Sequence, residues 1–315
     1  DPPVHADQRK AVTGVVAPMN LAKLETVIRE RVIRIIDNLP ENEEFNWVEK
    51  VSIELTTQML ATIFDFPFAE RRKLTDWSDL ATSSTALGGV LPDEVRREGL
   101  MECLDYFTEL RNERVKRDPQ EHNDLITLMA HSPATNQLEP MEYLGNLLLL
   151  IIGGNDTTRN SISGGVYALN QFPDQYKKLR QSPDLIPKMV PEIIRWQTPL
   201  THMRRIAKRD VEMHGKTIKE GDKVIMWYLS GNRDESVIED AERFVIDRPN
   251  PRHHLSFGYG IHRCMGNRLA EMQLRVLWEE ILKRFQLIEV VGDAERVSSN
   301  FIRGYSKLPV RVHRL

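Results

Sequence analysis

The sequence predicts a mainly helical protein with small antiparallel β-sheets. Long segments of the 315 residues place apolar side chains at helical spacing. Two shorter segments alternate apolar and polar residues around turn-forming dipeptides, as the strands of a hairpin do. Because only short breaks rich in proline, glycine and asparagine separate the helical segments, we expect connections within one domain and no interdomain linkers.

The expected helices share apolar side chains at three- and four-residue spacing. A first helix carries His5 and Arg9, and the others are expected at residues 21–39, 48–64, 93–117, 141–172, 187–197 and 266–285. A small sheet is expected at residues 205–228, around His-Gly-Lys and Glu-Gly-Asp turns. FQLIEVV and LPVRVHRL predict a second sheet around a turn at Gly292-Asp293.

Composition excludes several classes of protein. The 43 basic and 46 acidic residues give a net charge of -3, and no basic tract indicates nucleic-acid binding. The two cysteines form no CxxC motif, so neither a disulfide framework nor a zinc knuckle is indicated. The longest apolar run, residues 147–152, is too short to span a bilayer, and no signal-like stretch opens the chain. We therefore expect a cytoplasmic protein without a membrane anchor.

The most informative segment is HHLSFGYGIHRCMGNRLAEM, in which a loop delivers Cys264 to the start of a long amphipathic helix. The free N–H groups and partial positive charge of a helix N-terminus stabilise a thiolate and are expected to lower its pKa. Phe257 can pack against a flat ligand, and His262 can meet an acidic group at the ligand's edge. The loop backbone can pass close to such a ligand because it carries three glycines, Gly258, Gly260 and Gly266.

Two other interpretations of the cysteines are possible. A free cysteine is usually a small buried apolar residue, and this is the expected role of Cys103 in LMECLDYF. A zinc site would recruit His253, His254 and His262 beside Cys264, but their spacing matches no usual zinc pattern.

The segment FGYGIHRCMG resembles the cysteine loop of the cytochrome P-450 superfamily, FGxGxHxCxG, at every specified position. The resemblance implies a cytochrome P-450 fold, with residues 1–315 forming one domain that is N-terminally truncated, because the family continues upstream of DPPxH. It implies heme b (iron protoporphyrin IX) with Cys264 as the axial ligand. It also implies four partners for the two haem propionates: His5, Arg9, Arg205 and His262.

Polar residues interrupt the apolar pattern in LLLLIIGGNDTTRNS. This segment is similar to the oxygen-activation segment of the family, which implies that Gly154 makes room above the iron, while Asp156 and Thr157 relay protons to dioxygen. A helix merely capped or kinked by polar residues is the alternative.

Glu192 and Arg195, in PEIIRWQTP, have the spacing of an ordinary i,i+3 ion pair. Together with Arg248 in FVIDRP they resemble the structural Glu-Arg-Arg triad of the family, a scaffold behind the haem.

The resemblance implies a monooxygenase that uses O2 and NAD(P)H-derived electrons, delivered by a ferredoxin and a ferredoxin reductase because the chain has no flavin or iron–sulfur motif. GGNDTTRNSISGG and HMRRIAKRDVEMHGKTI are similar to bacterial soluble terminal hydroxylases of alkanes and fatty acids. The positions that face substrate in the family are mostly apolar here: Leu149, Ile152, Gly153, Leu200, Met203, Phe301 and Ile302. A terpene or other small apolar substrate, a peroxygenase and a haem sensor are the alternatives.

Overall fold

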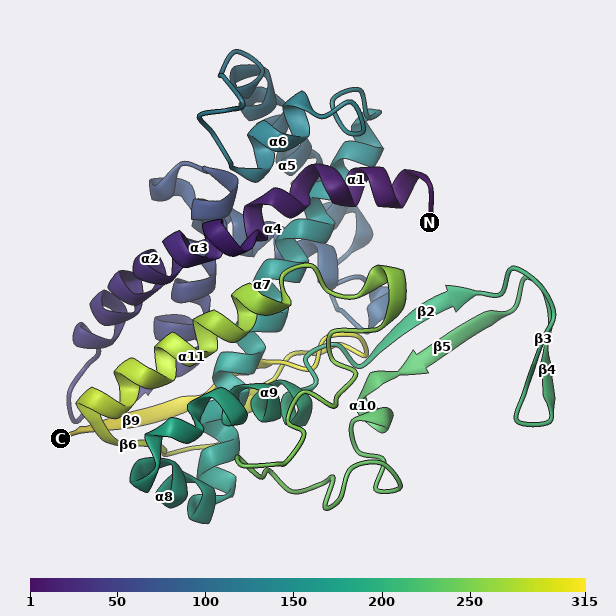
Figure 1. The fold of residues 1–315 in the computed structure, drawn as a ribbon. Coiled ribbons are helices and arrows are strands. Elements are labelled where there is room, and N and C mark those ends of the chain that lie inside the picture. Colours follow the sequence, from purple (N-terminus) through teal and green to yellow (C-terminus); the bar gives the residue numbers. More distant parts are fainter.

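The computed structural model describes residues 1–315, and helices dominate it (Figure 1). The helices are α1 (Val4–Thr13), α2 (Pro18–Asp37), α3 (Glu54–Phe64), α4 (Arg72–Thr82), α5 (Asp93–Arg114), α6 (Leu125–His131), α7 (Pro140–Gln171), α8 (Pro173–Gln181), α9 (Ile186–Gln197), α10 (Tyr228–Gly231) and α11 (Asn267–Arg284). A π-helical segment, Val48–Ile53, leads directly into α3.

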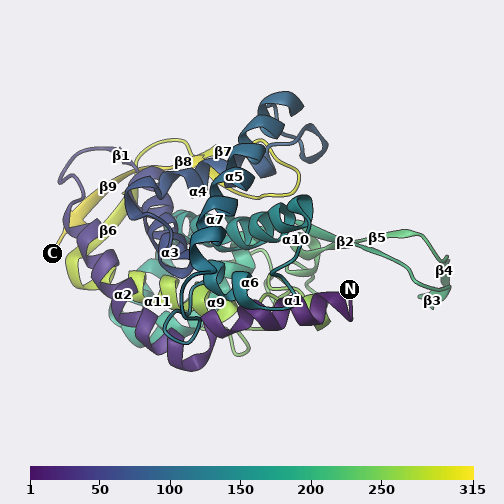
Figure 2. The same cartoon turned by 90° about the horizontal axis from the view of Figure 1, so that it is seen from above.

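The long helix α7 is the centre of the packing. It contacts α3 and α4 on one side and α9 and α11 on another (Figures 1 and 2). Its buried apolar residues divide between two hydrophobic clusters: Ile162 and Val166 belong to the larger one, and Leu147 and Ile151 to the smaller one. Burial of each such side chain stabilises the fold by about 1.5–3 kcal/mol.

The expected helices at residues 21–39, 93–117, 141–172, 187–197 and 266–285 are confirmed to within a few residues. α2 illustrates the cause, because Leu21, Ile28, Val32 and Ile35 lie on one buried face and Pro18 occupies the first turn. The helices α4, α6 and α8 were not predicted. They are short, and α4 buries Thr75 and Ser78 beside its apolar residues, which blurs the apolar periodicity.

The strands β2 (His202–Ile206) and β5 (Lys223–Trp227) pair antiparallel, and β3 (Val211–Met213) and β4 (Lys216–Ile218) pair farther out. The antiparallel pairing expected at residues 205–228 is confirmed, but as two separate pairs and not as one sheet. Together they form a long hairpin that projects from the body of the molecule (Figures 1 and 2).

The C-terminal strands β6 (Phe285–Val290) and β9 (Pro309–Arg314) pair antiparallel, and β1 (Phe45–Asn46) adds to β9 in the order β1-β9-β6. The second predicted sheet is confirmed, but the turn at Gly292-Asp293 does not join its two strands directly. The chain instead makes a long excursion that contains the pair β7 (Glu295–Arg296) and β8 (Tyr305–Lys307). A turn dipeptide signals that a strand ends, but it does not say where the next strand begins.

No single helix combines the length and the apolar character needed to cross a membrane. The bent pair Val4–Val16 and Pro18–Asp37, with 48° between its parts, meets that requirement by length and composition only.

Candidate active site

The loop before α11 folds back on itself at Cys264. The Cys264 N–H donates to the Phe257 carbonyl oxygen at 2.8 Å. Gly258 and Gly260 have φ angles of 68° and 71°, the left-handed region in which a side chain is strained. A Cβ on Gly258 would also lie 3.1 Å from the Tyr228 hydroxyl. The glycines of the predicted motif therefore allow a turn that a larger residue would disrupt.

The half-buried Cys264 thiol lies just before α11, for which Gly266 is the N-cap. Burial raises the pKa of Cys264, while the N–H groups of Gly266 and Asn267 and the charges of Arg9 and Arg263 lower it. The net direction is upward, so the expected lowering by the helix N-terminus is wrong as a net effect, although its N–H groups act in the predicted sense. A thiol that coordinates a metal ion is deprotonated outright, so the raised pKa does not oppose ligation.

Cys103 and His254 both have pKa values that burial shifts away from their usual range. Cys103 is fully buried in α5, and burial raises its pKa to about 12. His254 accepts a hydrogen bond from the Ser256 N–H at 3.2 Å, and burial among cationic side chains lowers its pKa to about 4. No three His, Cys, Asp or Glu side chains converge on a common point, so the geometry does not support the zinc alternative.

The four expected propionate partners come from three elements and converge beside the cysteine loop. The rings of His5 and His262 lie 4.3 Å apart. Burial lowers the pKa of His262, and Arg205 and Arg9 lower it further. Burial also lowers the pKa of His5, as do His262 and Arg9. The Asp1 carboxylate lies 2.9 Å from the His262 ring. Several basic side chains close together are unfavourable unless anions lie among them. The hydrogen-bond donors of these four side chains therefore fit the two carboxylates of a haem.

The two glycines of the α7 segment face different surroundings. A Cβ on Gly154 would lie 2.7 Å from Leu60 Cδ2 in α3, whereas a Cβ on Gly153 would meet nothing within 4 Å. The Thr157 hydroxyl donates to the Gly153 carbonyl oxygen at 2.8 Å. Gly154 therefore gives Leu60 room to pack, whereas Gly153 leaves open space beside Thr157. The helix runs unbroken through this segment, so its polar residues do not cap it.

Asp156 is fully buried on the side of α7 that faces α4. Its carboxylate accepts a hydrogen bond from the Ser78 hydroxyl at 2.8 Å and pairs with Arg159. Burial raises the pKa of Asp156, and Asp79 adds to the rise, while Arg159 and Ser78 oppose it. The sequence pattern indicates Asp156 but not these partners, because nothing in the chain signals that residues 78 and 79 lie against α7.

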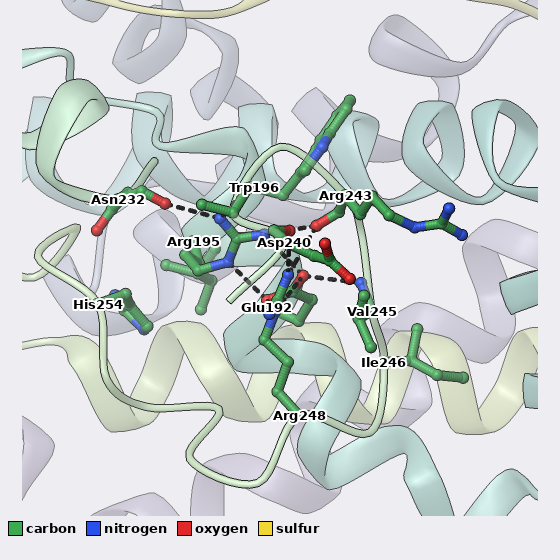
Figure 3. Close-up of polar contacts among 12 residues, drawn as sticks. Glu192, Arg195, Trp196, Asn232, Asp240, Arg243, Val245, Ile246, Arg248 and His254 are labelled. Atoms are coloured by element: carbon green, nitrogen blue, oxygen red, sulfur yellow. Dashed lines mark hydrogen bonds and ion pairs between the residues drawn. The ribbon is translucent and has the colours of Figure 1, made fainter. Parts of the chain in front are cut away.

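The structure brings Glu192, Arg195 and Arg248 together, with Glu192 and Arg195 buried and Arg248 half-buried (Figure 3). The Glu192 carboxylate accepts two hydrogen bonds from Arg195 at 2.7 and 2.8 Å, one from Arg248 Nε at 3.0 Å and one from the Val245 N–H at 2.8 Å. Arg195 also donates to three carbonyl oxygens, those of Asn232, Ala241 and Arg243.

Asn232, which was not predicted, connects this triad to the cysteine loop. Its carbonyl oxygen accepts from Arg195, while its side-chain oxygen accepts from the Leu255 N–H at 2.6 Å. Its side-chain N–H group donates to the Ser256 hydroxyl at 2.9 Å. The triad therefore fixes the residues that immediately precede Phe257.

The expected substrate-facing residues do not all share one surface. Leu149 is 70% exposed, and it lies on the same face of α7 as Gly153 and Thr157 because these residues are four apart. Ile152 is half-buried. Leu200 forms an isolated β-bridge with Ile302, whose side chain is only 4% exposed and has no surface left for a ligand.

The strand β2 presents two different faces. Met203 and Arg205 share one face because they are two residues apart. His202 lies on the other face, where its ring contacts Trp227 at 4.8 Å and Phe301 at 5.6 Å between centroids. His202 adds a polar group beside Phe301 that the expected apolar lining did not include.

Comparison with known proteins places this site in a family. The sequence model described as Cytochrome P450 matches residues 94–308. The solved structure of CYP153D17 from Sphingomonas sp. PAMC 26605 superposes with a TM-score of 0.92 at 50% identity, over 100% of this chain and 78% of that one. Linalool 8-monooxygenase of Pseudomonas putida is 38% identical over 98% of this chain and 76% of its own length. A methyl-branched lipid omega-hydroxylase of Mycobacterium tuberculosis is 32% identical over 98% of this chain and 73% of its own.

These matches define a haem-dependent oxidoreductase. The chain belongs to the cytochrome P450 family, whose members hold haem and use O2 with electrons derived from NAD(P)H. It is therefore a cytochrome P450 monooxygenase, and bacterial members generally receive their electrons from redox partners such as a ferredoxin and its reductase.

Proposed function

We propose that this monooxygenase hydroxylates the terminal carbon of a medium-length alkane or fatty acid. The observation that carries the proposal is the open face of α7, where exposed Leu149, side-chain-free Gly153 and Thr157 follow one another at four-residue spacing. This face is apolar at one end and carries a hydroxyl at the other, so it suits a hydrocarbon chain whose end lies near Thr157. The likeness to a protein named as a methyl-branched lipid omega-hydroxylase supports this substrate class.

The cofactor is held by residues of the cysteine loop, α1 and β2. Cys264 would be the iron ligand, and Phe257 would pack against the ring. Gly258 and Gly266 would let the loop backbone lie close to it. The four expected propionate partners are His5, Arg9, Arg205 and His262. When bound, the haem supplies the binding and reductive activation of O2.

The protons come from this chain. Thr157 holds a proton at its hydroxyl beside the Gly153 carbonyl, and Asp156 replaces that proton from the α4 side of the helix. A peroxygenase would not need this route. We therefore propose an external ferredoxin and ferredoxin reductase as electron donors, which separates the protein from both a peroxygenase and a haem sensor.

A terpene substrate is the second candidate. The relative at 38% identity is named for its action on linalool, and the same apolar residues would line a site for such a molecule.

Product formation with a surrogate ferredoxin, its reductase and NAD(P)H distinguishes these functions. We expect terminal alcohols from linear alkanes or fatty acids, and no product when peroxide replaces the electron donors. Conversion of linalool without conversion of any linear chain would overturn the first candidate in favour of the second.

The position of the new hydroxyl group in the product tests which residues line the substrate site. Terminal attack requires a narrow site, because the weaker subterminal C–H bonds otherwise react first. Phe301→Ala should shift the product toward subterminal alcohols more than it lowers total turnover, as should Ile152→Ala and Leu200→Ala. Phe68→Ala, at an exposed phenylalanine outside the proposed lining, is the control and should leave the product unchanged.

A further inference from the structure

Three arginines that are far apart in the chain gather on two aromatic side chains, Trp196 of α9 and Tyr305 of β8. The guanidinium carbons of Arg233 and Arg303 lie 5.9 and 5.7 Å from the centroid of the Trp196 ring. The guanidinium carbon of Arg296 lies 3.9 Å from the centroid of the Tyr305 ring. These three residues, Arg233, Arg296 and Arg303, form an arginine cluster, and none of them belongs to the candidate active site.

The backbone brings two of these arginines to the same aromatic ring. Arg296 of β7 is the cross-strand partner of Tyr305, so their side chains point to the same side. Arg303 precedes Tyr305 by two residues, and Gly304 between them faces the opposite way, where an added Cβ would lie 2.5 Å from the Asn160 side chain. The charges of Arg296 and Arg303 both oppose the rise that burial causes in the pKa of Tyr305. Arg296 and Arg303 therefore both lie close to the Tyr305 side chain.

The arginine cluster has too little negative charge for its three cations. Glu242 pairs with Arg233 Nε at 3.1 Å, but the Glu242 side chain is 72% exposed. Arg233 and Arg303 donate to the same acceptor, the Trp196 carbonyl oxygen, at 2.9 and 2.8 Å. Two guanidinium groups that share one oxygen atom repel each other. Burial, followed by the charge of Arg233, lowers the pKa of Arg303 to about 10, as expected for a cation that lacks a close anion.

Arg303 also keeps hydrogen-bond donors that no protein group uses. Its Nη1 donates to the Trp196 and Gln197 carbonyl oxygens, whereas its Nε and Nη2 donate to no protein acceptor and are not buried. Arg296 is exposed and offers further donors beside the same ring. A guanidinium presents its N–H groups as a planar fork, which matches the spacing of the oxygens of a phosphate or carboxylate. The unused donors and the excess positive charge therefore fit the same kind of ligand.

We propose that the arginine cluster is a binding site for a small oxyanion, with inorganic phosphate as the probe. Arg303 donates from Nε and Nη2, Arg296 donates from the exposed side, and Arg233 contributes positive charge. The cluster joins β7 and β8 to the segment that follows Asn232, so an anion bound there stabilises the folded holoenzyme. Anion binding at this site is independent of which substrate the enzyme hydroxylates.

Calorimetric titration of the holoenzyme with inorganic phosphate, at an ionic strength held constant with sodium chloride, tests the proposal. Using the holoenzyme keeps the proposed propionate partners occupied. We expect one saturable site per chain and a Tm that rises with phosphate concentration. Arg303→Met keeps an unbranched side chain against Trp196 but removes the charge. It should weaken phosphate affinity by about tenfold or more, because a hydrogen bond to a charged group is worth at least that factor.

Three further variants separate a built site from general attraction to positive charge. Arg296→Met should weaken phosphate binding as Arg303→Met does, and because Arg296 is exposed it decides the test if Arg303→Met fails to fold. Arg303→Lys keeps the charge but loses the planar fork, so its affinity should lie between those of the parent and of Arg303→Met. Arg209→Met, at an exposed arginine of the β2–β5 hairpin, is the matched control and should keep the affinity of the parent. Absence of saturable phosphate binding, or an equal loss of affinity in Arg209→Met, would overturn the proposal.

Discussion

Removing the charge of Glu192 should destabilise the fold more than most single substitutions. Glu192 is fully buried, and its carboxylate holds two arginines, Arg195 and Arg248. Glu192→Gln keeps the size of the side chain but leaves the buried Arg195 without its counter-charge. Truncation of one partner of a buried ion pair costs about 3–5 kcal/mol.

The remaining hydrogen bonds of Arg195 put the expected loss of unfolding free energy at the lower end of that range. Arg195 keeps three carbonyl acceptors, and a glutamine can still accept one of its N–H groups. We therefore expect a loss of about 3 kcal/mol. An unfolding entropy of about 2.1 cal/mol/K per residue gives roughly 0.7 kcal/mol/K for a chain of this length, so Tm should fall by about 4–5 °C.

Thermal and urea unfolding of the holoenzyme, followed by circular dichroism, measure this loss. Glu235→Gln changes an exposed glutamate in the nearby loop and is the matched control, expected to stay within about 0.5 kcal/mol of the parent. Should Glu192→Gln fail to fold, Arg248→Lys keeps the test usable, because it retains a charge and loses bonds to carbonyl oxygens, at a cost of about 1–2 kcal/mol. A loss for Glu192→Gln that matches the Glu235→Gln control would refute the reasoning.

Three further predictions concern the site and the pH response. Cys264→His should abolish the red-shifted Soret band of the ferrous carbon monoxide complex, whereas Cys103→Ala should keep it; the opposite result would reassign the iron ligand. Burial opposes ionisation of Glu280, but bonds to three basic side chains lower its pKa to about 2. The contribution of the Glu280 carboxylate to stability is therefore present above about pH 4 and is lost as the pH falls toward 2. In Glu280→Gln, the free energy of unfolding measured in urea should fall less steeply between these pH values than in the parent. An unchanged pH dependence would contradict this. Gly153→Ala should weaken carbon monoxide binding at unchanged or higher stability, while Gly154→Ala should lower stability because its Cβ meets a leucine of α3; equal effects would contradict the assignment of faces.

The sequence was sufficient to predict those features that depend on residues close together in the chain. Apolar spacing predicted α2, α7 and α11, because a helix that packs on one side needs apolar residues every three or four positions. The cysteine loop was also predictable, since Gly258 and Gly260 occupy backbone conformations that other residues avoid.

The partners of buried polar groups could not be predicted. Ser78 lies 78 residues from Asp156, and Asn232 lies 37 residues from Arg195. Which residue meets a buried carboxylate depends on how two helices pack, and side chains such as serine and asparagine are mostly exposed, so their identity does not indicate a buried partner. The same dependence explains why Cys264 was expected to have a lowered pKa: the helix N-terminus is visible in the sequence, but the opposing burial is not.

The polar segment of α7 shows why a motif in a helix must be divided among faces before roles are assigned. In sequence its residues form one group, yet the helix turns them toward three surroundings. Asn155 bonds to α3, Asp156 and Arg159 face α4, and Gly153 and Thr157 share the open face. In the proposed proton route, a proton that moves from Asp156 to Thr157 would therefore cross the helix surface, although the two residues are adjacent in the chain. The proposed route thus depends on the contacts that α4 makes with Asp156 as well as on the residues of the motif.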